Sequence, residues 1–204
     1  MTPAQSRREM YSEATRAALL DEATRLFAER GYAETSLADI AVATQVTRGA
    51  VYHHFEGKQA LFEAVLDRQE ANAVRVVREA AVAEDPLVAA LQALDAFLEH
   101  CDDPVYGRLC WQEGPVALGF RRWREYEQRY FFGLVEQFVE PLFGAGYLDP
   151  ALPRAASVQF FFWNLGGAGL ALAEADVADR SRIRAEWREL IGRTILAFQP
   201  PAAG

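Results

Sequence analysis

Residues 35–58, TSLADIAVATQVTRGAVYHHFEGK, contain the signals of two short helices joined by a tight turn. Ser36 is a favoured N-cap residue, and Asp39, three residues later, completes a capping-box pattern that starts a helix over residues 37–44. Thr47 can cap a second helix, which leaves only a two-residue turn between them. Two helices joined so closely must cross, so the stretch predicts a helix-turn-helix motif.

The motif spans about residues 36–55, and its two sides differ in chemistry. Four apolar positions predict its buried side: Ile40, Ala41, Val46 and Val51. The second helix then turns small, basic and aromatic residues outward: Arg48, Gly49, Ala50, Tyr52 and His53. Groups of this kind can approach a base edge or a phosphate. The outward side therefore predicts a nucleic-acid contact.

Lys58 is the only lysine of the chain, and it opens the next helix. Its charge adds to the free N–H groups of a helix N-terminus, and both favour a phosphate. Arg48 is the preferred base contact because a guanidinium binds guanine with two hydrogen bonds. An ordinary exposed arginine and a half-buried Tyr52 remain open alternatives. The full predicted DNA-binding set is Thr35, Ser36, Thr47, Arg48, Gly49, Ala50, Tyr52, His53 and Lys58.

Composition and charge limit the classes of protein that this chain can belong to. The 204 residues are 51% hydrophobic and 25% charged, which is typical of a globular protein. The net charge of −8 argues against binding nucleic acid through overall charge, so a local arrangement must supply any contact. Residues 1–58 carry a net charge of −1 and the remainder −7. The opening stretch is therefore the less acidic part.

No catalytic group, metal site or cofactor is predicted. Cys101 and Cys110 are too far apart in sequence for a close zinc or dithiol pair and are expected to be buried thiols. His53 and His54 lie in the helix-turn-helix, His100 is isolated, and no glycine-rich phosphate loop is present. The N-terminus lacks the apolar core of a signal peptide, so we expect a cytoplasmic protein.

The rest of the chain is predicted to be helical throughout. A first helix begins near Tyr11 and ends at Gly31, with the apolar stripe Leu19, Ala23, Leu26 and Phe27. Later helices are expected at 58–82, 86–101, around 109–111 with a stop at Gly114-Pro115, and at 118–143, 154–176 and 181–198. The predicted fold is all-α with about nine helices, divided into an N-terminal domain, residues 1–58, and a C-terminal domain, residues 59–204.

Two segments leave alternatives open. Arg7 and Arg8 lie ahead of the first helix, where they are either solvated charges or contacts to a phosphate or the minor groove. Residues 155–173 carry no charge and approach membrane-spanning length. Their glycine cluster, with Gln159 and Asn164, favours a buried interface helix over a membrane helix, so no membrane partner is expected.

The N-terminal region resembles the TetR family of transcriptional regulators. The resemblance covers Thr15 to Phe62 and rests on Arg16, Leu19-Leu20, Ala23, Leu26-Phe27, Gly31-Tyr32, Thr35, Ile40-Ala41, Val46, Gly49, Val51-Tyr52, His54-Phe55, Lys58 and Leu61-Phe62. The family usually has glycine in the turn where this chain has Gln45. A positive φ at a non-glycine residue costs on the order of 1 kcal/mol.

The resemblance implies a homodimeric regulator, usually a repressor, that binds a near-palindromic DNA operator and a small-molecule effector; activation also stays open. It implies a four-helix dimer bundle from the last two long helices. The apolar 154–176 helix and the stripe around Trp187 suit that role on their own evidence, apart from the resemblance, because a monomer would leave these apolar surfaces exposed to water. The predicted interface is Trp163, Gly166, Gly167, Leu170, Trp187, Leu190, Ile191 and Thr194.

An aromatic pocket for a small, largely apolar or aromatic effector is predicted in the C-terminal region. Its candidate residues are Phe97, Trp111, Phe120, Trp123, Tyr126, Glu127, Phe131, Phe161, Phe162 and Asn164. The aromatic side chains can equally be plain core. Glu127 lies on an apolar stripe, where an unpaired carboxylate is costly. Its partner is expected to be an arginine or a cationic or hydrogen-bonding ligand.

Two other classes of protein were weighed. An enzyme would need a nucleophile with a base, metal ligands or a phosphate loop, and the sequence shows none of these patterns. A helical dimeric scaffold that has lost operator binding is the stronger alternative, because the N-terminal region is slightly acidic and Gln45 is atypical.

Overall fold

The computed structural model describes residues 7–201, and every regular element in that range is helical. The N-terminal elements are α1 (Arg7–Glu34), α2 (Leu37–Ala43) and α3 (Arg48–His54), followed by the long α4 (Lys58–Ala80). The later elements are α5 (Pro86–Cys101), α6 (Pro104–Tyr106), the π-helix η1 (Gly107–Glu113), α7 (Gly114–Leu118), α8 (Phe120–Glu127), the π-helix η2 (Gln128–Phe132), α9 (Gly133–Gly144), α10 (Arg154–Glu174) and α11 (Val177–Ala197).

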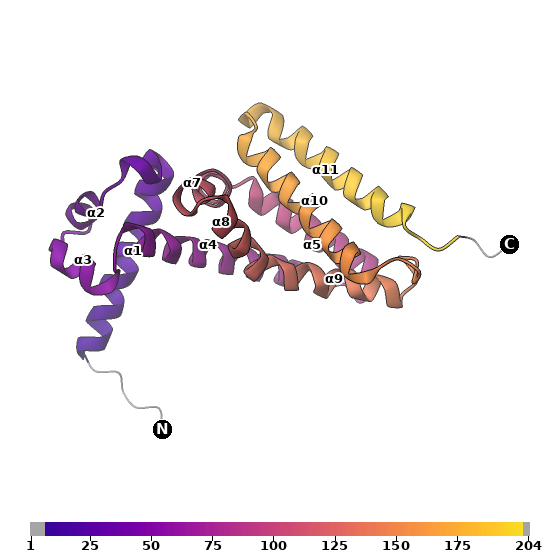
Figure 1. Ribbon diagram of the computed structural model, residues 1–204, viewed down its shortest axis with the longest axis horizontal. Coiled ribbons are helices and arrows are strands. Elements are labelled where there is room, and N and C mark those ends of the chain that lie inside the picture. The colour runs from indigo at the N-terminus through magenta and orange to yellow at the C-terminus, as the bar shows by residue number, and fades with distance from the viewer. Residues whose placement is uncertain (1–6, 202–204) are drawn as a thin grey trace, which may run out of the picture.

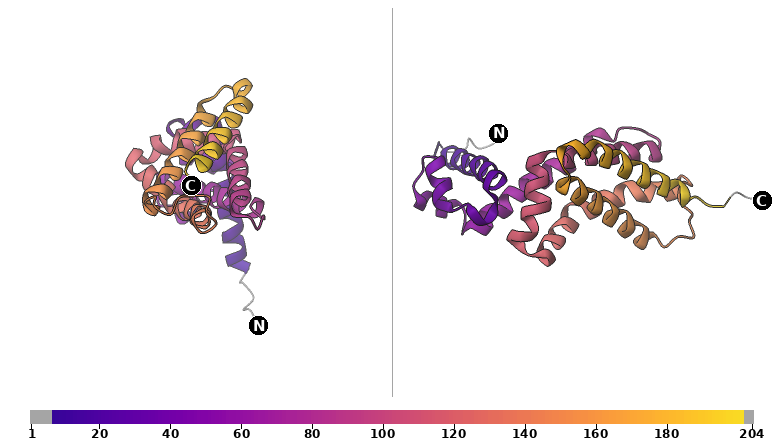
Figure 2. Two further views of the ribbon diagram at one scale, coloured as in Figure 1. Left: turned by 90° about the vertical axis from the view of Figure 1, so that its right-hand side faces the viewer. Right: turned by 90° about the horizontal axis from the view of Figure 1, so that it is seen from above.

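Helices α6, η1 and α7 follow one another without a break, as do α8, η2 and α9. Residues 7–201 therefore form nine continuous helical segments, and the predicted all-α fold is confirmed. The molecule is elongated (Figure 1), with α1–α3 at one end and the N-terminal part of α4 beside them. Helix α4 runs from there into the C-terminal helices, where α10 and α11 lie side by side (Figures 1 and 2).

Helix α1 buries the predicted stripe: Leu19, Ala23, Leu26 and Phe27 are at most 2% exposed. The helix begins at Arg7 rather than near Tyr11, so the expected arm is shorter than predicted. The side chains of Arg7 and Arg8 lie outside the described residues, and their two interpretations stay predictions. Gly31 has φ 83°, a value that glycine adopts without strain, and it breaks the helix before its last residues.

The helix around Trp111 does not stop at Gly114-Pro115, contrary to the sequence prediction. The N–H of Gly114 donates to the carbonyl of Leu109, five residues earlier, so the helix is π-wound there. Pro115 then falls in the first turn of α7, where its missing N–H costs nothing, and the helix runs to Leu118. Gly119, with φ 76°, makes the break.

Glycines of α10 make room for aromatic rings of the same chain. A Cβ at Gly169 would lie 2.4 Å from Cζ2 of Trp111, and one at Gly167 would lie 3.2 Å from Cη2 of Trp187. Within residues 7–201, no helix combines the length and apolar character that crossing a membrane requires.

Candidate nucleic-acid interface and effector cavity

The two short helices are capped as their sequence predicts. Ser36 Oγ accepts the N–H of Asp39 at 3.2 Å, and the carboxylate of Asp39 accepts the N–H of Ser36 at 3.0 Å. The hydrogen bonds from Ser36 lower the pKa of Asp39 below its ordinary value. Thr47 Oγ1 accepts the N–H of Ala50 at 3.2 Å. These caps fix where α2 and α3 begin.

The turn between the helices depends on Gln45. Its φ is 56°, and it is the only non-glycine residue with positive φ among residues 7–201. The N–H of Val46 donates to the carbonyl of Ala41 at 3.0 Å, which closes α2 onto the turn. Gln45 therefore adopts a backbone conformation that favours glycine, and the chain makes the helix-turn-helix without the glycine that is usual in this turn.

Helix α3 exposes most of the side predicted to bind nucleic acid. Val51 is fully buried against α2, whereas Arg48, Gly49 and His53 are exposed, and Tyr52 is 47% exposed. Tyr52 is therefore not a core residue. The Arg48 guanidinium lies 5.6 Å from the centre of the Tyr52 ring and donates to its hydroxyl at 3.3 Å. This contact holds Arg48 along the exposed side of α3.

The chemistry of this surface is basic and polar. Helix α3, RGAVYHH, contains no acidic residue, and Ala50 is partly exposed. A Cβ at Gly49 would meet only Thr47 Oγ1 at 3.8 Å, so the surface is open there. His54 is half-buried, and its burial, followed by the charges of His53 and Arg16, lowers its pKa. His54 is therefore neutral at pH 7, as a packed histidine.

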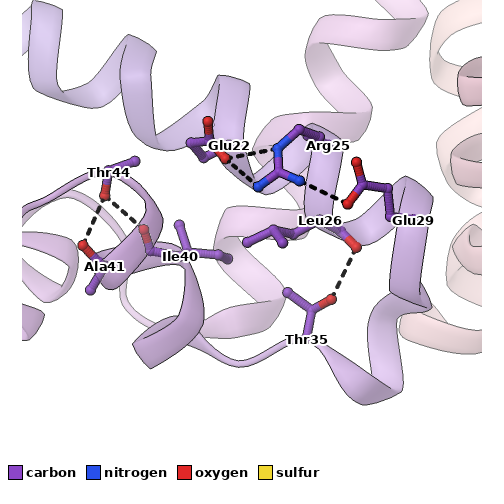
Figure 3. A network of polar contacts seen from close by, with 8 residues as sticks. All are labelled: Glu22, Arg25, Leu26, Glu29, Thr35, Ile40, Ala41 and Thr44. Atoms are coloured by element: carbon purple, nitrogen blue, oxygen red, sulfur yellow. Dashed lines mark hydrogen bonds and ion pairs between the residues drawn. The ribbon is translucent and has the colours of Figure 1, made fainter.

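Thr35 does not lie on this surface, which corrects the sequence prediction. Its side chain is 1% exposed, and its hydroxyl donates to the carbonyl oxygens of Gly31 at 2.9 Å and Leu26 at 3.2 Å. Figure 3 shows the contact with Leu26 beneath the start of α2. Thr35 therefore ties the end of α1 to the motif.

Lys58 lies at the start of α4, where its ammonium group hydrogen-bonds the end of α1. Its Nζ donates to the carbonyl oxygens of Tyr32 at 2.8 Å and Ala33 at 3.2 Å and lies 4.4 Å from the centre of the Tyr32 ring. An ammonium has three donors, so one remains for a phosphate. The phosphate contact stays a prediction, and the structure adds a second role for the same side chain.

Two adjoining cavities lie among the C-terminal helices. The larger is a partly open space of about 600 Å³, solvent included, and is lined only by apolar side chains of α4, α5, η2, α9, α10 and α11. The smaller is also partly open, measures about 410 Å³ with solvent included, and lies beside η1 and α8. Phe97, Phe131, Val135 and Leu165 line both. The predicted ligand residues that line at least one cavity are Phe97, Trp111, Trp123, Glu127, Phe131, Phe161 and Phe162.

The other three predicted ligand residues lie elsewhere, which corrects their assignment. Phe120 is 64% exposed because it begins α8 directly after the break at Gly119. The Tyr126 hydroxyl donates to the carboxylate of Asp67 on α4. Asn164 donates to the carbonyl of Phe160, one turn earlier in α10, at 2.7 Å. Tyr126 and Asn164 are each next in sequence to a residue that lines the smaller cavity, Glu127 and Leu165.

Glu127 is buried, with 6% of its surface exposed, and its partner is the carboxyl group of Glu70 and not an arginine. Sequence analysis missed Glu70. A signal was present, because Glu70 lies between Leu66, Ala73 and Val77 on the buried side of α4. A glutamate on such a stripe needs a partner for the same reason as Glu127.

Three residues of the predicted dimer surface are exposed in the single chain, and the dimer contact stays a prediction. Trp163, Leu170 and Leu190 are 42%, 39% and 56% exposed, although all are large and apolar. Ile191 is 5% exposed and lines the larger cavity, so its assignment to an exposed interface is corrected.

The smaller residues of that prediction have other contacts in the chain. Thr194 is half-buried, and its hydroxyl donates to the carbonyl of Leu190 at 2.8 Å. Gly166 lines the smaller cavity, and Gly167 faces Trp187.

The described residues hold no cluster of three or more His, Cys, Asp or Glu side chains placed to bind a metal ion.

The fold and the exposed side of α3 define the class of a helix-turn-helix DNA-binding regulator with a separate helical domain. Two family models match the chain: that of bacterial regulatory proteins of the tetR family over residues 19–65, and that of the tetracycline repressor-like C-terminal domain over residues 87–194. The chain belongs to the TetR family of transcriptional regulators. This family is not a class of enzymes.

Individual relatives agree with the family. A transcriptional repressor of Mycobacterium tuberculosis is 44% identical over 84 residues, 40% of this chain and 45% of that protein. The regulator AcrR of Shigella flexneri is 46% identical over 61 residues, 30% of this chain and 28% of that protein. The chain thus matches less than half of the length of these curated relatives.

A solved structure of a TetR-family regulator from Pectobacterium atrosepticum is similar over nearly the whole chain. Its TM-score is 0.78 at 26% identity, and the match covers 97% of this chain and 99% of that one. The similarity therefore includes both the helix-turn-helix end and the cavity-bearing helices.

Proposed function

We propose that this protein is a cytoplasmic homodimeric repressor that binds a near-palindromic operator and is released by a small, largely apolar or aromatic molecule. The observation that carries the proposal is the exposed side of α3, where Arg48, Gly49, Tyr52 and His53 lie on a helix that holds no acidic residue. The predicted contacts Ser36 and Thr47 are exposed at the starts of α2 and α3. A negative overall charge makes such a local surface necessary.

The effector part of the proposal rests on the cavities. The larger cavity has apolar walls from six helical segments, and a cavity of this kind gains from burying an apolar molecule. Val77 of α4 lines it, and α4 also begins beside α3. A ligand that binds better to one position of α4 shifts the spacing of the two recognition helices in the dimer.

The dimer part rests on α10 and α11. Phe160, Trp163 and Leu170 of α10 and Leu190 of α11 leave large apolar side chains exposed in the single chain. A second copy of the same two helices would bury them in a four-helix arrangement.

Selection of bound duplexes from a random DNA pool, followed by a screen for compounds that release the enriched duplex, tests the proposal. We expect enrichment of a sequence with two inverted half-sites, and release by apolar or aromatic compounds. A folded protein that enriches no sequence would reject operator binding and favour the helical scaffold. Enrichment without release by any compound of this class would reject the effector part alone.

A further inference from the structure

The smaller cavity ends at a pair of buried carboxyl groups. Glu70 of α4 is 1% exposed and Glu127 of α8 is 6% exposed, and their carboxyl groups hydrogen-bond each other. Within residues 7–201, no basic side chain contributes to the pKa of either group. Two carboxyl groups in direct contact must share a proton, because two adjacent charges in a core are costly.

Glu70 already has partners on its other sides, whereas Glu127 faces the cavity. The Tyr106 hydroxyl donates to Glu70 Oε2 at 3.0 Å, and the Cys110 thiol also hydrogen-bonds Glu70. Glu127 hydrogen-bonds Glu70 and lines the smaller cavity. Glu127 is therefore the member of the pair that a ligand can reach.

The remaining wall of the smaller cavity is mostly aromatic: Trp111, Trp123, Phe131, Phe162 and Trp163. Aromatic ring faces attract organic cations, with tryptophan the strongest of the side chains. A carboxyl group beside several tryptophan rings suits a cation better than a neutral hydrogen-bond donor, because an ionised carboxyl group and the ring faces both attract positive charge. The larger, apolar cavity continues from this one through Phe97 and Phe131.

Within the function proposed above, on which this step rests, we propose that the effector is a lipophilic organic cation. Its charged head lies beside Glu127 among the tryptophan rings, and its apolar body fills the larger cavity. The ligand class is thus narrower than an apolar or aromatic molecule.

The charged and titratable neighbours of the pair are compatible with a cation. Burial raises the pKa of the Tyr106 hydroxyl and of the Cys101 and Cys110 thiols well above their ordinary values, so these groups stay neutral at pH 7. The His100 ring lies 4.5 Å from the Tyr106 ring, centre to centre, and burial lowers the pKa of His100. Arg124 is the one basic group that lines the smaller cavity, and it is exposed, where solvent screens its charge.

Binding of a cation is linked to loss of a proton from the pair. Burial raises the pKa of Glu70 to about 7, and burial together with the neighbouring Glu70 carboxyl raises the pKa of Glu127 well above its ordinary value, so the free pair is uncharged well below pH 7. A cation stabilises the ionised pair and expels a proton when it binds below that pH. As the pH increases towards about 7, the affinity for the cation therefore rises by up to about tenfold per pH unit, and above about 7 it levels off.

The test compares a phenylbutyl trimethylammonium ion with its neutral isostere, which carries a tert-butyl group in place of the trimethylammonium group. Binding is measured on the full-length protein at pH 6 and pH 8 by calorimetry and by tryptophan fluorescence. At pH 8 we expect the cation to bind at least about tenfold more tightly than the isostere. At pH 6 the ratio of the affinity for the cation to that for the isostere should be several-fold smaller, whereas the affinity for the isostere should not change.

Glu127→Gln keeps the shape and a hydrogen bond to Glu70 but cannot ionise. We expect the preference for the cation at pH 8 to fall several-fold, because the carboxyl group that faces the cavity is gone while Glu70 and the tryptophan rings remain. The neutral isostere should bind as before, which shows that the cavity is intact. The matched control Glu125→Gln changes an exposed residue of the same helix and should behave like the wild type.

Equal binding of the two probes to the wild type, or a preference for the cation as large in Glu127→Gln as in the wild type, would overturn this inference. Binding of neither probe would also overturn it. Selection of DNA by the same protein preparation, without any probe, tests operator binding separately. Release of the selected duplex by the neutral isostere alone would support the proposed function and reject the cation.

Discussion

Gln45 shows how a single residue departs from the usual sequence of the motif without changing its geometry. It holds φ 56° in an exposed turn, where the family usually has glycine. A β-branched residue fits this conformation much less well than glutamine. The turn should therefore be tolerant of glycine and intolerant of valine.

For Gln45→Gly, relief of strain opposes the greater freedom of the unfolded chain, and we expect the free energy of unfolding to change by less than about 1 kcal/mol. For Gln45→Val we expect a loss of about 1–2 kcal/mol. Urea denaturation of both variants measures the difference. A valine variant as stable as the glycine variant would contradict the strain at this turn.

The Glu70–Glu127 pair makes a second prediction, concerning stability and pH. Below pH 4.5 the Glu70 carboxyl is protonated in the folded and unfolded chain, whereas between pH 4.5 and about 7 only the folded chain keeps the proton. Because the folded pKa is raised, the contribution of Glu70 to the free energy of unfolding falls over that range and is constant above it. The loss amounts to roughly 3 kcal/mol for Glu70 at about 1.4 kcal/mol per pH unit.

Glu70→Gln removes this titration, and glutamine can still accept from Tyr106 and donate to Glu127. We expect the variant to gain stability relative to the wild type between pH 4.5 and pH 8, measured by denaturation at both values. Glu125→Gln is the control for a carboxyl in water. A difference between Glu70→Gln and wild type that is the same at both pH values would rule out the raised pKa.

Sequence patterns predicted residues of the helix-turn-helix better than those of the cavity. Ser36, Asp39 and Thr47 act through neighbours three residues away, so local sequence contains the whole interaction. Glu70 and Glu127 are 57 positions apart in the sequence and meet across two helices, so no local pattern contains their interaction. Thr35 failed as a predicted contact because its hydroxyl bonds carbonyl groups of α1.

At the level of elements, η1 connects the cavity to the end of α1. Trp111 of η1 lines the smaller cavity, and Glu113, its last residue, accepts the N–H of Tyr32 at 2.7 Å. Arg108 pairs with Glu113 at 2.6 Å. A π-wound segment has a strained hydrogen-bond register and is often found at functional sites. A ligand that moves Trp111 therefore acts on the contact with Tyr32.

Glu113→Ala leaves the Tyr32 N–H and Arg108 without this partner, and we expect a loss of about 1–3 kcal/mol in the free energy of unfolding. Arg122→Ala breaks a more exposed ion pair, with Glu63 of α4 at 2.8 Å, and should cost less than about 1 kcal/mol. Urea denaturation compares the two. A larger loss for Arg122→Ala would show that Glu113 is not the main contact.

Element boundaries followed from sequence where a cap or a positive φ set them, as at Asp85 before α5 and Gly31 in α1. Sequence did not predict that the helix continues through Pro115. A π-turn depends on the packing of residues such as Trp111 and Cys110 and has no local sequence signal. The same packing explains Gly114, where an added Cβ would lie 2.8 Å from the Trp123 ring.

For the whole molecule, the exposed apolar side of α10 and α11 predicts a dimer. These helices form one outer side of the C-terminal part (Figure 2), away from α1–α3. Leu190→Glu places a charge on this side and should shift the protein from dimer to monomer in sedimentation. Val116→Glu, at another exposed apolar residue, is the control. A Leu190→Glu protein that sediments like the wild type would place the interface elsewhere.

The most direct measurement is fluorescence anisotropy of the wild type, Arg48→Ala and Lys58→Ala on a selected duplex and on a scrambled one over a range of salt. Arg48→Ala should lose about 1–3 kcal/mol on the selected duplex and much less on the scrambled one. Lys58→Ala should weaken binding to both equally and flatten the salt slope by about one. Arg48→Ala that binds the selected duplex as tightly as the wild type would contradict operator recognition by α3.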